Sequence, residues 1–66
     1  MEIYVNGEPR ALAGSETIES LIAALALDTR KIAIERNAAV VPRSLYAGTA
    51  LAPGDRIEIV HFIGGG

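Results

Sequence analysis

The sequence contains no cysteine and no tryptophan, and His61 is its single histidine. Without cysteine there is no disulfide framework and no thiolate zinc site, and one histidine would leave a zinc ion dependent on carboxylates. No apolar run approaches the ~18 residues that cross a membrane. The opening stretch MEIYV has no cationic segment before an apolar one, so it does not resemble a secretion signal. We therefore expect a cytoplasmic protein that binds neither a metal nor a membrane.

The motifs of self-contained catalysis are absent as well. Neither GxxxxGK[ST] nor GxGxxG occurs, so no nucleotide-binding loop is present. The serines have no neighbouring base in the sequence and fit caps and turns. His61 fits the rim of a strand, and Glu35 and Glu58 fit solvated strand positions better than a catalytic carboxylate pair. We therefore expect a protein that is not an enzyme and binds no cofactor of its own.

Positive charge is scarce and scattered. The 66 residues include six basic and eight acidic side chains, which gives a formal net charge of −2 at pH 7. A nucleic acid partner is not expected, because binding to phosphates requires clustered basic residues. Half of the residues are apolar, as in a folded domain, and this length allows one domain with a small core.

The first twelve residues predict a β-hairpin, which Gly14-Ser15 ends. MEIYV alternates, with Met1, Ile3 and Val5 on one face, as in a half-buried strand. The pair Asn6-Gly7 is a strong hairpin signal because both residues tolerate a positive φ. The segment EPRAL then returns as a second strand, and its proline restricts that strand to a sheet edge or a strand start.

The next segment changes to the period of an α-helix. Thr17 is placed to cap this helix, and the acidic residues beside it suit the positive end of the helix dipole. The pair Asp28-Thr29 is predicted to end it. The apolar stripe at i, i+3, i+4 and i+7 consists of Ile18, Leu21, Ile22 and Leu25.

The second half of the chain returns to strand patterns. IAIER predicts a strand with its isoleucines on one face, and Asn37-Ala38 predicts a turn into AVVP, although alanine is unusual where a turn needs a positive φ. The segment SLYAGTAL is predicted to be irregular, with Leu45 and Leu51 anchored in the core. PGD predicts a type II turn that leads into RIEIVHFI, the longest strand pattern in the chain.

This order of hairpin, helix, strand pair and final strand predicts an α+β fold. The economical packing places one helix on one face of a mixed sheet of four or five strands, the β-grasp (ubiquitin-like) architecture. The first and last strands would lie side by side in parallel, joined by a right-handed crossover through the helix. We expect the β-grasp domain to span residues 1–63, with residues 64–66 as a flexible glycine tail.

The tail consists of Gly64, Gly65 and Gly66, and the α-carboxylate of Gly66 is a reactive group. A carboxylate can attack the α-phosphate of ATP to give an acyl-adenylate, which a thiol, a persulfide or an amine then displaces. Another protein must hold the tail during this reaction. Three residues extend to ~10 Å and carry no side chains, so they fit a narrow channel.

These features resemble the small sulfur carriers and ubiquitin-like modifiers. The segments AVVPRS and PGDRIEIV, followed by the final glycines, are similar to the ThiS family, the sulfur carriers of thiamine biosynthesis. The resemblance implies that a ThiF-like adenylyltransferase activates the terminus with ATP and that a cysteine desulfurase supplies the sulfur. The resulting thiocarboxylate would serve thiazole synthase (ThiG). Gly65 and Gly66 match the terminal pair of the family, with Gly66 as the modified residue.

Three alternatives remain open at this point. The small subunit of molybdopterin synthase has the same fold and tail chemistry but acts on a pterin precursor. A ubiquitin-like modifier would be joined through Gly66 to lysines of other proteins. A non-covalent binding module would keep its activity without Gly65 and Gly66.

Three residues are candidates for docking the activating partner. If the isoleucines of the last strand face the helix, Val60 and Phe62 must face outward, on the same side as Tyr4 of the neighbouring strand. We expect Tyr4, Val60 and Phe62 to form an exposed apolar patch beside the tail.

Overall fold

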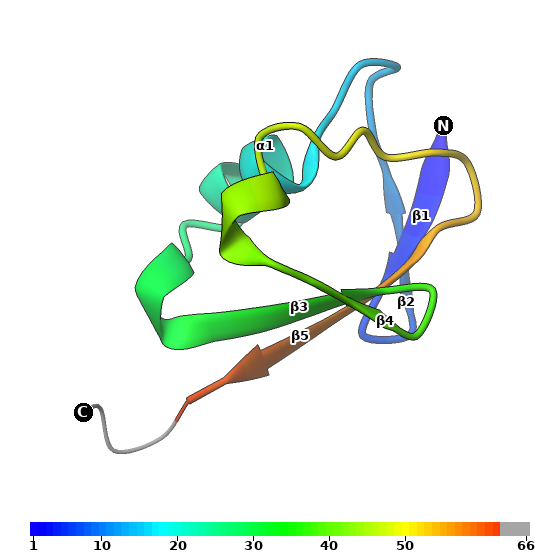
Figure 1. Ribbon diagram of the computed structural model, residues 1–66. Helices are drawn as coiled ribbons and strands as arrows, with labels where there is room; N and C mark the ends of the chain where they lie inside the picture. The colour runs from blue at the N-terminus through cyan, green and yellow to red at the C-terminus, as the bar shows by residue number, and fades with distance from the viewer. Residues whose placement is uncertain (63–66) are drawn as a thin grey trace.

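The computed structural model describes residues 1–62 and contains a five-stranded sheet and one α-helix (Figure 1). The elements in chain order are β1 (Glu2–Val5), β2 (Glu8–Ala11), α1 (Ile18–Ala24), the 3₁₀ turn η1 (Thr29–Lys31), β3 (Ile32–Arg36), β4 (Ala39–Val41), the 3₁₀ turn η2 (Arg43–Leu45) and β5 (Arg56–His61).

The strands lie side by side in the order β2-β1-β5-β3-β4. β1 and β5 run parallel, whereas the pairs β1–β2, β3–β4 and β3–β5 are antiparallel. The helix α1 covers one face of this mixed sheet, with the residue 43–50 loop beside it (Figure 1). The predicted β-grasp fold is confirmed, and β5 occupies its centre.

Both predicted hairpin turns place two consecutive residues in the left-handed region. In the first turn φ is 50° at Asn6 and 83° at Gly7, and in the second it is 51° at Asn37 and 70° at Ala38. These are the signs of a type I′ turn, whose twist matches that of the flanking strands. Ala38 adopts this conformation at a steric cost that asparagine or glycine would largely avoid.

The helix begins as predicted and ends earlier than predicted. Thr17 accepts a hydrogen bond from the Ser20 backbone N–H, and the Ser20 hydroxyl accepts one from the Thr17 N–H, which forms a capping box. The prediction that Asp28-Thr29 ends the helix was wrong, because α1 ends at Ala24 and Ala26 has a φ of 57°. A residue in the left-handed region stops a helix. Asp28 instead caps the following 3₁₀ turn.

The core lies between α1 and the sheet. Leu51 is buried as predicted, but the prediction that Leu45 is anchored was wrong, since its exposed fraction is 53% and that of Tyr46 is 4%. The Tyr46 carbonyl accepts a hydrogen bond from the Glu19 N–H, which fixes this segment against the start of α1. The buried apolar residues are Ile3, Ile18, Leu21, Ile22, Ile32, Ile34, Tyr46, Leu51, Ile57 and Ile59.

Candidate functional site

The predicted reactive tail, Gly64 to Gly66, lies outside the residues that the structure describes. What the structure does show is β5, the strand that leads to this tail, and the surfaces around it. The first half of β5 lies between β1 and β3, whereas its second half projects beyond the β1–β2 hairpin (Figure 1).

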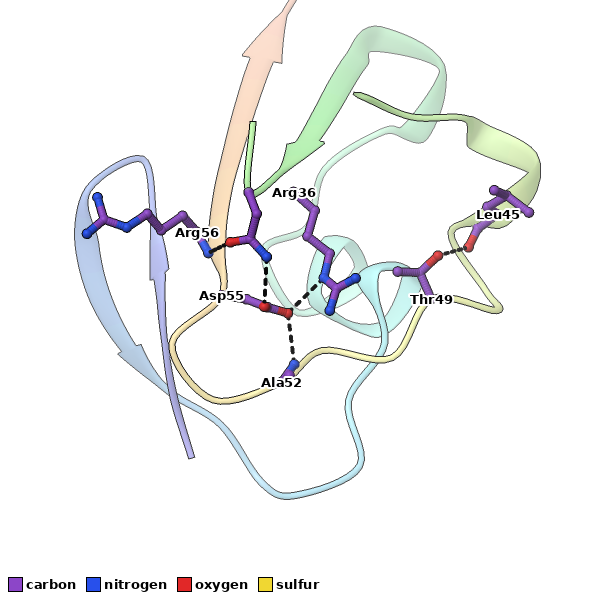
Figure 2. Close-up of polar contacts among 7 residues, drawn as sticks. Arg36, Leu45, Thr49, Ala52, Asp55 and Arg56 are labelled. Atoms are coloured by element: carbon purple, nitrogen blue, oxygen red, sulfur yellow. Dashed lines mark hydrogen bonds and ion pairs between the residues drawn. The ribbon is translucent and has the colours of Figure 1, made fainter. Parts of the chain in front are cut away.

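A buried carboxylate anchors the start of β5. Asp55 accepts hydrogen bonds from Nε of Arg36 at 2.9 Å, Nδ2 of Asn37 at 3.1 Å and the Ala52 backbone N–H at 2.8 Å (Figure 2). Oδ1 of Asn37 also accepts a hydrogen bond from the backbone N–H of Arg56, which is the first residue of β5. This network ties the turn at residues 52–55 to the β3–β4 hairpin.

The same contacts set the ionisation of Asp55. Burial alone raises the pKa of this carboxyl, but the hydrogen bonds from Ala52, Arg36 and Asn37 outweigh burial and hold the pKa below its ordinary value. Asp55 is therefore a charged, structural residue at neutral pH. Its role is not evident from the sequence, where the only signal is its position after the Pro53-Gly54 turn.

On the side of β5 away from β3, the Asn6 side chain takes the place of a pairing strand at the middle of β5. The backbone N–H of Ile59 donates to Oδ1 of Asn6 at 2.8 Å, and Nδ2 of Asn6 donates to the Ile59 carbonyl at 3.4 Å. Asn6 begins the hairpin turn, so β1 ends there as a partner of β5. Beyond this point β5 is paired with β3 alone among residues 1–62.

The three predicted docking residues are all exposed on the sheet face opposite α1. The exposed fractions are 37% for Tyr4, 54% for Val60 and 56% for Phe62. Tyr4, however, is in register with Arg56, four residues before Val60, which is about 13 Å along the strand. It shares a shallow hollow with Arg56 and Glu58. The structure therefore places Val60 and Phe62 together near the tail, and Tyr4 apart from them.

Two further features lie on this open face. Glu35 and Glu58 are directly opposite each other in the β3–β5 register, and neither makes a side-chain hydrogen bond within residues 1–62. Val40, which lies opposite Glu35 on β4, is strongly exposed and was not singled out from the sequence. The open face thus carries an acidic pair with Val40 and Val60 beside it and Arg56 further along β5.

Residues 1–62 contain no group of three or more metal-ligating side chains close enough to hold an ion. Within the same residues, no helix has the length and apolar character required to cross a membrane. His61 is exposed at the rim of the sheet, as the sequence suggested.

Comparisons with known proteins support this fold. The ThiS family matches residues 3–66. The crystal structure of the thiamine biosynthesis protein ThiS from Geobacter metallireducens superposes with a TM-score of 0.86 at 32% sequence identity, over the whole of both chains.

Two relatives extend the comparison to sequence. The sulfur carrier protein ThiS of Bacillus subtilis is 40% identical over 50 residues, which are 76% of each chain. A thiazole synthase of Paramagnetospirillum magneticum is 50% identical over all 66 residues, and this chain spans 20% of its length. A thiazole synthase of Magnetococcus marinus is 47% identical over all 66 residues, and this chain again spans 20% of its length. In these relatives a ThiS-like segment and a thiazole synthase belong to one polypeptide.

The family match covers nearly the whole chain, and the fold and the sequence identities agree with it. Among the families that the sequence left open, this evidence selects the ThiS family. The chain belongs to the ThiS family, the sulfur carriers of thiamine biosynthesis.

Proposed function

We propose that this chain carries sulfur as a thiocarboxylate on Gly66 and delivers it for thiazole formation. The observation that carries the proposal is the membership of the chain in the ThiS family, whose match extends to residue 66. The composition supports it, because a chain without cysteine has no side chain that could carry the sulfur as a thiol.

The chemistry begins at the α-carboxylate of Gly66. A ThiF-like adenylyltransferase would bind ATP, whose α-phosphorus the carboxylate attacks, with pyrophosphate as the leaving group. The terminal sulfur of a protein persulfide, formed from cysteine by a desulfurase, would then attack the carbonyl carbon and displace AMP. A thiol would cleave the resulting acyl disulfide, which releases the thiocarboxylate and leaves a disulfide as the oxidised product. Glycine suits this position because the tail must pass through the active site of another enzyme without side chains that clash.

Thiazole synthase is the proposed acceptor of the sulfur. The supporting observation is that two relatives at about half identity carry a matching segment within thiazole synthases. Two functions joined in one chain raise the effective concentration of each for the other, which favours a transfer between them. In this account the present chain and a ThiG-like enzyme are partners.

Val60 and Phe62 are the proposed docking residues for the adenylyltransferase. Both are large, apolar and more than half exposed, and they lie at the end of β5 nearest the tail. Aromatic side chains at the centre of an interface commonly contribute most of its binding energy. Tyr4 lies further along the sheet, beside Arg56, and would contribute only to a larger interface.

The proposal is tested at the terminal residue. We compare the chain ending at Gly66 with one lacking Gly66 and with one extended by a single alanine. Only the first should consume ATP with the adenylyltransferase and become a thiocarboxylate, because the other two lack the carboxylate at the required position. All three should melt at the same temperature, since a solvated terminal residue contributes little packing. Activation of an extended chain that remains uncleaved would contradict the proposal.

A further inference from the structure

The end of β5 has an unpaired backbone edge that faces away from β3. The Phe62 N–H donates to the Lys31 carbonyl on the β3 side at 2.9 Å. Backbone groups alternate in direction along a strand, so the N–H and C=O of His61 point the other way, as those of Ile59 do toward Asn6. Within residues 1–62 no strand pairs with His61 on that side.

A groove lies directly below this edge, on the helix side of the sheet. Its volume is about 410 Å³, and β1, β2, β5 and the segment after α1 form its walls. Its apolar lining includes Val5, Leu25, Leu27 and Ile59. A side chain that points down from a strand added beside His61 would enter this groove.

An arginine side chain also lines the groove. Arg10 lies on the helix side of β2, opposite the buried Ile3, and its side chain lines the groove. Nε of Arg10 is buried and has no hydrogen-bond partner within residues 1–62. Since the protein already covers Nε, a bound group in the groove would have to meet the other N–H donors of the guanidinium, and Arg10 is only partly buried.

We propose that an extended segment of thiazole synthase adds to β5 beside His61 as a further strand. Its backbone pairs with the N–H and C=O of His61, an apolar side chain fills the groove, and a hydrogen-bond acceptor meets the guanidinium of Arg10. Strand addition at an open sheet edge is a common mode of peptide recognition, in which the backbone gives affinity and the pockets give specificity.

The position of this edge, close to the terminus, points to thiazole synthase as the partner. Gly66 follows His61 by five residues, which extend to at most about 17 Å. An enzyme that receives the terminus in its active site must therefore contact the end of β5. This inference rests on the proposed function, and it adds to it a second contact surface, on the face opposite Val60 and Phe62.

The test uses proline at two adjacent positions. His61→Pro removes the outward N–H and also the imidazole that lines the groove, so it is compared with His61→Ala, which removes only the imidazole. A proline is tolerated where its missing donor faces solvent. His61→Pro should fold with a nearly unchanged melting temperature and bind the thiazole synthase of the source organism about tenfold more weakly than His61→Ala. Val60→Pro is the matched control, because the Val60 N–H faces β3, and it should destabilise the fold instead.

Two further measurements keep the test decisive if His61→Pro fails to fold. In the unmodified chain, the His61 amide should exchange with solvent at least tenfold more slowly once thiazole synthase is bound. Arg10→Met keeps the apolar stem and removes the donor, so it should weaken binding several-fold without lowering the melting temperature. A purely structural role of Arg10 would instead lower the melting temperature.

The outcomes separate this inference from the proposed function. Unchanged exchange at His61 in the complex, unchanged affinity of a folded His61→Pro, or the absence of any complex would each overturn the strand addition. Formation of the thiocarboxylate on Gly66 is measured separately with the adenylyltransferase. Its absence would overturn the proposed function whatever the exchange at His61 shows.

Discussion

The two ends of β5 differ sharply, although their sequences alternate in the same way. At its start, Ile57 is fully buried between β1 and β3, and the Asp55 network holds the preceding turn. At its end, Val60 and Phe62 are exposed, and β3 is the only neighbouring strand within residues 1–62. The strand is fixed where it enters the sheet and accessible where it leads to the tail. This division suits a carrier, because the fold is stabilised away from the residues that partners must reach.

The largest expected effect is on the anchored end. Ile57→Ala removes a fully buried side chain from the central strand and should lower the free energy of unfolding by about 3–4 kcal/mol. Thermal denaturation followed by circular dichroism measures this loss. Val60→Ala, in the same strand but exposed, should change stability by less than ~0.5 kcal/mol. Equal losses at the two positions would remove the contrast between the two ends.

The next effect concerns the buried carboxylate. Asp55→Ala leaves three donors without their acceptor and should cost about 2 kcal/mol of stability. Asp55→Asn is the control, because it keeps one acceptor oxygen and should lose less. Urea denaturation at pH 7 compares the variants. Wild-type stability in Asp55→Ala would show that the network does not anchor β5.

A third prediction concerns the accessible end. Phe62→Ala should leave the melting temperature nearly unchanged and raise the apparent KM for adenylation about tenfold, since a truncated interface aromatic typically costs ~1–3 kcal/mol of binding. Ile59→Ala should do the reverse and cost about 2–4 kcal/mol of stability. If Phe62→Ala unfolds the protein and Ile59→Ala does not, the assignment of the buried and exposed faces of the sheet is wrong.

The pH dependence should also report on the anchored end. The pKa of Asp55 is lowered in the folded protein, so its contribution is present above the unfolded pKa of ~3.9 and is lost as the pH falls through and below that value. Unfolding free energies between pH 7 and pH 3 should decline less in Asp55→Asn than in the wild type. Parallel curves would show that other carboxylates cause the acid sensitivity.

The smallest effect is expected at a surface ion pair. Asp28 accepts from the Arg30 side chain and backbone, and these contacts lower the pKa of Asp28 to about 2. Both partners are in contact with solvent, where ion pairs contribute little. Asp28→Asn should therefore melt within experimental error of the wild type. A clear decrease would mean that the cap of η1 supports the second half of the chain.

Local patterns predicted most of the fold because each had one dominant physical cause. The Asn6-Gly7 turn follows from tolerance of a positive φ, and the helix start at Thr17 follows from a side chain that accepts a backbone N–H. Local patterns could not predict that Tyr46, and not Leu45, is the buried residue of its segment. This burial depends on how the segment around Tyr46 packs against α1, and this segment is joined to α1 by a backbone hydrogen bond to Glu19, far away in the sequence.

The candidate site was predictable only in part. Strand alternation correctly placed Val60 and Phe62 on the open face. It could not give the register between β1 and β5, which pairs Tyr4 with Arg56 and separates it from Phe62. The Asp55 network and the groove beside His61 likewise depend on contacts between distant segments. The chemistry proposed for Gly66 rests on the family and on the composition.

The most direct test of the central claim is the intact mass of this chain after incubation with ATP, cysteine, a thiol reductant, the adenylyltransferase and the cysteine desulfurase of the source organism. Replacement of one carboxylate oxygen by sulfur adds about 16 Da. We predict that the mass increases by this amount, that fragmentation places the increase on Gly66, and that omission of ATP abolishes it. An unchanged mass with all components present, or an increase located away from Gly66, would contradict the account.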